Sequence, residues 1–84
     1  MARKRKIVSI QVQTTRLTGG GAETVPYLDG KATHWSVYVR YKNGEVQWLA
    51  DTPVDRCSSE GRRTALVFAA ELSMEHGVPI EKIY

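Results

Sequence analysis

The side chains best suited to acid–base, nucleophilic or metal chemistry are His34, Cys57 and His76. Neither histidine has a sequence neighbour that completes a catalytic dyad, and Cys57 has no identified base beside it. A metal site would need all three to converge with a carboxylate, without any regular ligand spacing. His76 comes where a helix is expected to end, and a cation there interacts favourably with the helix dipole. We therefore expect no enzyme activity, no cofactor and no metal.

The glycines do not match a nucleotide-binding loop. A Walker-type loop needs a second glycine ahead of its Gly-Lys pair and a hydroxyl residue after it, whereas Val25 and Ala32 stand in those places around Gly30-Lys31. No helix is expected after Gly19-Gly20-Gly21, which excludes a dinucleotide fingerprint. We interpret residues 17–31 as a mobile, irregular, Gly-rich loop that either binds a partner or only connects two strands.

Positive charge is concentrated at one end of the chain. Four of the 12 Lys and Arg stand at residues 3–6, which leaves eight basic against nine acidic side chains elsewhere. The remainder is nearly neutral, so any attraction for phosphates resides first in residues 1–6, which we expect to be disordered. A nucleic-acid-binding arm and a merely solubilising end are both compatible with this tail.

Residues 34–51 are typical of a β-hairpin, because Asn43-Gly44 separates two alternating, β-rich runs. A two-residue loop would pair Lys42 with Glu45 and Ser36 with Asp51. One face would then be apolar and belong to the core. Its members would be Trp35, Val37, Val39, Tyr41, Val46, Trp48 and Ala50.

Two further elements complete the predicted fold. Residues 7–15 alternate as a half-buried strand, and a helix is expected from Ser58 or Ser59 to about His76, with Gly77 after its end. We predict one α+β domain over residues 1–84, built from a three-stranded antiparallel meander with one C-terminal helix packed on one face. A short fourth strand after the helix is possible in this scheme.

The helix has more apolar surface than one sheet face can cover. Ala65, Phe68, Ala69 and Leu72 suffice for the sheet, which leaves a second stripe of Val67, Ala70 and Met74. Either the C-terminal residues 78–84 fold over this stripe, or it is a surface for self-association or for a protein partner.

Cys57 is the single cysteine, so no intramolecular disulfide can form and a reducing cytoplasmic compartment is expected. No apolar run is long enough to cross a membrane, and residues 7–12 alternate in polarity instead of forming the apolar core of a signal peptide. We expect a soluble, cytoplasmic protein without small-molecule substrate or membrane partner.

Pro26-Tyr27, Gly30, the run 34–39 and a helix that opens with Arg62-Arg63-Thr64-Ala65 resemble the strand and second-helix pattern of double-stranded-RNA-binding domains. The resemblance implies phosphate contacts for Arg62 and Arg63, although a strand at 7–15 replaces that family's first helix. The element order is also similar to integrase arm-binding domains, which read DNA with a sheet face. With the exit at residues 74–79, it further resembles some phage anti-CRISPR proteins, which are small non-enzymatic binders.

We predict a non-enzymatic binding module whose partner is a protein or a second copy, acting through Val67, Ala70 and Met74. The surplus of apolar helix surface and the absence of net positive charge on the main body favour this hypothesis. Nucleic acid is the alternative partner. Its candidate contacts are Arg3, Lys4, Arg5 and Lys6 in the tail, Tyr38, Arg40, Lys42 and Gln47 on the hairpin, and Arg62 and Arg63 at the helix start.

Overall fold

The computed structural model describes residues 6–55 and 57–84. The expected disorder of the basic tail therefore concerns mainly residues that lie outside the described part of the chain. The elements in order are β1 (Ile7–Thr18), β2 (Gly21–Thr24), the 3-10 helix η1 (Tyr27–Asp29), β3 (His34–Tyr41), β4 (Val46–Pro53), α1 (Glu60–His76) and β5 (Ile80–Ile83). Among the described residues, no helix combines the length and the apolar character needed to cross a membrane.

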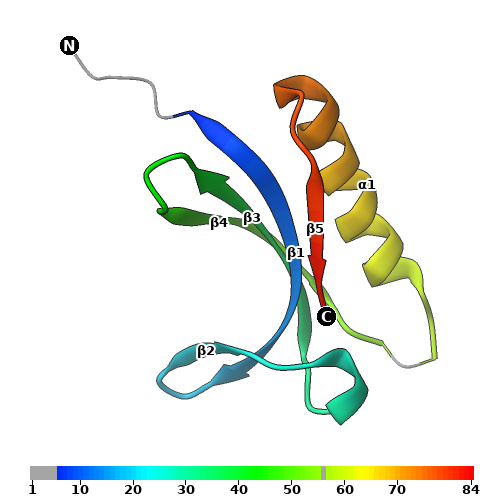
Figure 1. Cartoon of the computed structure of the whole chain (residues 1–84). Helices are drawn as coiled ribbons and strands as arrows, with labels where there is room; N and C mark the ends of the chain where they lie inside the picture. The colour runs from blue at the N-terminus through cyan, green and yellow to red at the C-terminus, as the bar shows by residue number, and fades with distance from the viewer. Residues whose placement is uncertain (1–5, 56) are drawn as a thin grey trace.

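The strands form one sheet with the order β2-β1-β3-β4, and α1 packs on one face of it (Figure 1). The α+β class and the antiparallel meander β1-β3-β4 agree with the prediction. The predicted number of three strands is too low. β2 pairs with the end of β1, and β5 pairs in parallel with the middle of β1.

The hairpin of β3 and β4 differs by one residue from the predicted register. The Gly44 amide donates to the Tyr41 carbonyl oxygen (2.9 Å), and the Tyr41 amide donates to the carbonyl oxygen of Glu45 (2.8 Å). The loop is therefore Lys42-Asn43-Gly44, in which Gly44 has a φ of 90°. This matches the three-residue hairpin loop that ends in a left-handed glycine.

A bulge in the middle of the hairpin compensates for the one-residue difference between the observed and the predicted loop. Ser36 still pairs with Asp51 as predicted, but Tyr38 pairs with Trp48, so Leu49 is the extra residue. Because a shift of one residue turns a side chain to the other face, Trp48 lies on the face opposite α1 and is 55% exposed. Its predicted place in the core is wrong.

The core lies between α1 and the sheet face toward it. Its fully buried members are Ile10, Val12, Trp35, Val37, Val39, Ala65 and Ala69. The two alanines are small, so the helix backbone comes close to the sheet. The helix bounds follow the predicted signals, since Ser59 is the N-cap residue and Gly77 closes the helix with a φ of 65°.

The C-terminal residues add to the sheet edge. β5 pairs with β1 from Ile10↔Ile80 to Gln13↔Ile83, and the Ile10 amide donates to the Pro79 carbonyl oxygen (3.0 Å). Ile80 packs against the core. The C-terminal residues therefore lie beside β1, and they leave the outer side of α1 uncovered (Figure 1).

Residues 17–31 do not form the irregular loop that the sequence predicted, because much of this segment has regular structure. β1 continues to Thr18, turns at Gly19-Gly20 and pairs with β2, where Arg16 and Glu23 form an ion pair at 2.6 Å. Tyr27 in η1 stacks on Trp35 with ring centroids 4.9 Å apart. The mobility of this segment stays a prediction.

Candidate interaction surface

The two sides of α1 differ sharply in exposure. Ala65 and Ala69 face the sheet and are 1% and 0% exposed, whereas Val67 is 51% and Met74 85% exposed. At about 3.6 residues per turn, Val67, Ala70 and Met74 share one stripe on the side away from Ala65. We call Leu66, Val67, Ala70 and Met74 the helix patch. The sequence predicted three of these four residues.

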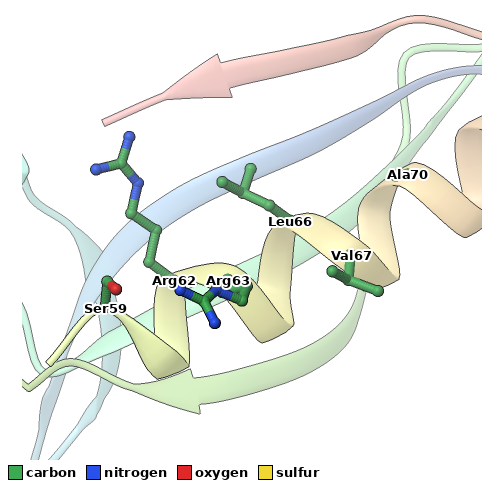
Figure 2. Close-up of a pocket in the computed structure, with 6 residues that line it drawn as sticks. All are labelled: Ser59, Arg62, Arg63, Leu66, Val67 and Ala70. Atoms are coloured by element: carbon green, nitrogen blue, oxygen red, sulfur yellow. The ribbon is translucent and has the colours of Figure 1, made fainter.

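A shallow groove runs along the N-terminal half of this surface. It is lined by Ser59, Arg62, Arg63, Leu66, Val67 and Ala70 (Figure 2). Leu66 is partly buried and packs against the core, so it connects the inner and outer sides of α1. The groove floor is thus apolar, and its basic end is the start of the helix.

The paired arginines at that end have different surroundings. Arg62 extends toward the end of β5 (Figure 2), and its Cζ atom lies 5.5 Å from the Tyr84 ring centroid and 5.9 Å from the Trp35 ring centroid. Trp35 and Tyr84 themselves meet edge to face at 5.0 Å. These cation–π contacts hold Arg62 in the fold. Arg63 is exposed and has no ion pair with another described residue.

The hairpin candidates for nucleic-acid contact do not form one surface with these arginines. Arg40 lies on the sheet face opposite α1, where it forms an ion pair with Glu81 at 3.8 Å. Gln47 pairs with the core residue Val39 and so lies on the α1 face, where its Oε1 accepts from the Tyr41 hydroxyl (2.6 Å). Its predicted place beside Arg40 is wrong, because of the loop register.

Two further basic candidates, Lys6 and Lys42, lie at the hairpin turn. The Lys42 amide donates to the carbonyl oxygen of Lys6 at 2.8 Å, so the start of β1 and the hairpin turn adjoin. Arg3, Lys4 and Arg5 precede Lys6 but lie outside the described residues. Arg62 and Arg63 follow Gly61, which contacts Pro53 at the other end of β4. Among the described candidates, Lys6 and Lys42 therefore lie at one end of the hairpin, and Arg62 and Arg63 adjoin its other end.

The sheet face opposite α1 carries a polar network that the sequence analysis missed. The Ser36 hydroxyl donates to Asp51 Oδ1 (2.6 Å), which also accepts from Trp48 Nε1 (2.8 Å). The Ser36 and Thr15 hydroxyls are 2.8 Å apart. Because Ser36 already donates its proton to Asp51, Thr15 is the donor in this second hydrogen bond. The predicted pairing of Ser36 with Asp51 was the only signal for this cluster.

Tyr38 lies next to this network. Its partial burial, and secondly the negative charge of Asp51, raise the pKa of the Tyr38 hydroxyl, and the neighbouring Ser36 hydroxyl partly offsets this rise. Ser36 is 1% exposed, so its hydroxyl cannot reach a substrate as a nucleophile. The network therefore links the strands by hydrogen bonds.

The residues considered for catalysis or metal binding do not assemble into a site. His34 Nδ1 contacts the Thr33 hydroxyl at 2.9 Å, and the Cys57 amide donates to Asp55 Oδ1 at 2.8 Å. His76 is exposed at the end of α1. Within the described residues, no three His, Cys, Asp or Glu side chains are grouped closely enough to hold a metal ion.

Comparison of the chain with protein-family models, with curated proteins and with solved structures finds no match.

Proposed function

We propose that this chain is a small, non-enzymatic protein-binding module that docks its partner on the helix patch. The observation that carries the proposal is the exposure of Val67 and Met74 on a helix whose opposite side is buried against the sheet. Single exposed apolar residues are common on protein surfaces, but a contiguous stripe beside an apolar groove is typical of an interface.

Burial of the exposed part of this surface would favour association, since Val67 is 51% and Met74 85% exposed. Full burial of a Val or Met side chain contributes about 1.5–3 kcal/mol. The groove beside Val67 has an apolar floor formed with Leu66 and Ala70 and an exposed arginine, Arg63, at its end. Arginine at the margin of an apolar patch is a common anchor in protein interfaces.

Site-specific photo-crosslinking tests this proposal. A photoreactive amino acid is placed at Val67 or Met74 of the full chain in its source cells, with Lys42 at the hairpin turn as the matched exposed control. We expect the photoreactive residue to form protein adducts at both helix positions. The same adducts should not form when it is placed at position 42. Equal adducts at all three positions, or no adducts at the helix, would contradict the proposal.

A folding control separates docking from stability. Val67→Glu and Met74→Glu change exposed side chains, so we expect both variants to remain folded by circular dichroism and to lose the crosslinked partner. Ala69→Glu introduces a charge at a position that is 0% exposed and is expected to unfold the protein. Unfolding of the first two variants would show that their side chains are structural.

Nucleic-acid binding is the second candidate, and one observation favours it. The hydrogen bond between Lys42 and Lys6 brings the end of the basic tail against the hairpin turn. Both side chains are exposed there. A tail that carries Arg3, Lys4 and Arg5 would add to this cluster, and such clusters bind phosphates in a salt-dependent manner.

A further inference from the structure

We infer that the partner of the helix patch is a second copy of this chain, with the two α1 helices packed antiparallel about a two-fold axis between Val67 and Ala70. The inference rests on the proposed function, because it names the partner that the same surface binds. Isologous contacts of this kind require a surface that complements itself.

The spacing on the outer side of α1 suits a helix–helix seam. Glu60, Arg63, Val67, Ala70 and Met74 follow one another at alternating steps of three and four residues. This is the repeat that places side chains along the contact line of two packed helices. Ala70 at the centre is small, so it leaves room for Val67 of the second copy.

Charge decides the relative direction of the two helices. A parallel pair would place Arg63 against Arg63 and Glu60 against Glu60, which is repulsive. In the antiparallel pair, Arg63 faces Met74 of the second copy and lies about one helical turn from its Glu71. The C-terminal end of the opposite helix also attracts a cation.

At the ends of the seam, Glu60 of one copy faces the second copy's helix end at His76 and Gly77. The negative end of a helix does not attract an acid, so the preference for the antiparallel direction comes from Arg63 and not from Glu60. Arg63 is exposed and Glu71 is exposed, so both are available for contact between copies. Arg62 is held by the Trp35 and Tyr84 rings and is not needed in the seam.

A charge-swap cycle tests the inference on the purified full chain by analytical ultracentrifugation over a range of protein concentrations. We expect a concentration-dependent dimer for the natural sequence. Arg63→Glu alone, or Glu71→Arg alone, turns two attractive contacts per dimer into repulsive ones and should weaken association about tenfold or more. The double variant restores the contacts in reversed order and should recover association to within about threefold of the natural sequence.

Lys42→Glu serves as the control, because it changes an exposed charge at the hairpin turn and should leave dimerisation unchanged. A protein that stays monomeric at all concentrations overturns the inference, as does a double variant that recovers nothing. If the chain is monomeric while the crosslinker at Val67 captures a different protein, the inference fails and the proposed function stands. If no protein is captured and no dimer forms, both fail.

Discussion

The carbonyl oxygen of Pro53 occupies the space that a Cβ atom on Gly61 would need. Thr52 Oγ1 also donates to the Gly61 carbonyl oxygen at 2.7 Å, so the end of β4 and the first turn of α1 are in direct contact. This contact sets where the helix starts on the sheet. It therefore helps decide which side of α1 is buried and which side carries the helix patch.

Gly61→Ala should destabilise the protein in spite of the better helix propensity of alanine. Propensity alone would stabilise by about 1 kcal/mol, but the clash with a backbone oxygen should give a net loss of about 1–3 kcal/mol. Urea unfolding measures the difference. Gly20→Ala is the control, since a Cβ there meets nothing within 4 Å. A stabilised Gly61→Ala variant would show that α1 does not approach Pro53.

The hairpin register can be tested with the two tryptophans. Trp35 is 3% exposed and Trp48 is 55% exposed. In Trp48→Phe the remaining fluorescence should resist quenching by acrylamide, whereas in Trp35→Phe it should be quenched readily. Equal protection of both rings would favour the two-residue loop, which places Trp48 in the core.

The Tyr38 hydroxyl should lose its proton at higher pH than an ordinary tyrosine. Burial and the Asp51 charge raise its pKa above 10.0, so absorbance at 295 nm should show a late-titrating tyrosine that is absent in Tyr38→Phe. Asp51→Asn keeps an oxygen acceptor but removes the charge, and should lower this pKa while leaving the effect of burial. An unchanged titration in Asp51→Asn would show that the carboxylate does not act on Tyr38.

The same shift makes stability depend on pH in one alkaline range. Between the ordinary value of 10.0 and the higher folded value, native Tyr38 keeps a proton that the unfolded chain has lost. Stability from this group is therefore complete below pH 10 and decreases as the pH rises above it. Tyr38→Phe should remove this part of the pH dependence in denaturation experiments.

Nucleic-acid binding, if it occurs, should depend on Lys6 and Lys42 more than on Arg40 or Arg62. Neutralising both lysines should weaken binding to a mixed DNA and RNA pool and lower the salt slope by about one for each phosphate that is no longer neutralised. Fluorescence anisotropy at several salt concentrations measures this. Binding that is absent, or that does not respond to salt, would exclude this candidate.

Local patterns in the sequence were enough to predict the elements with short-range signals. The alternation of residues 7–15 predicted a half-buried strand, and the apolar hairpin face predicted that Val37 and Val39 enter the core. Ile10, Val12, Val37 and Val39 are buried there. Gly77 and the serines before Glu60 marked the ends of the helix. These signals act within a few residues, so no distant part of the chain is needed to interpret them.

The sequence could not decide the hairpin loop or the partners of distant segments. Two and three residues around Asn43-Gly44 are both allowed locally, and only the bulge at Leu49 reconciles the observed loop with the pairing of Ser36 and Asp51. The pairing of β5 with β1 joins segments at opposite ends of the chain. Such contacts depend on which sheet edge is free once the other strands have packed.

At the candidate surface, too, the sequence decided one feature and the tertiary structure decided another. The amino-acid order was sufficient to predict an apolar stripe at Val67, Ala70 and Met74, because helical periodicity assigns side chains to faces. It did not decide whether residues 78–84 cover that stripe, since they suit a strand edge and a helix surface equally well. β5 pairs with the free edge of β1, and this long-range pairing leaves Met74 exposed.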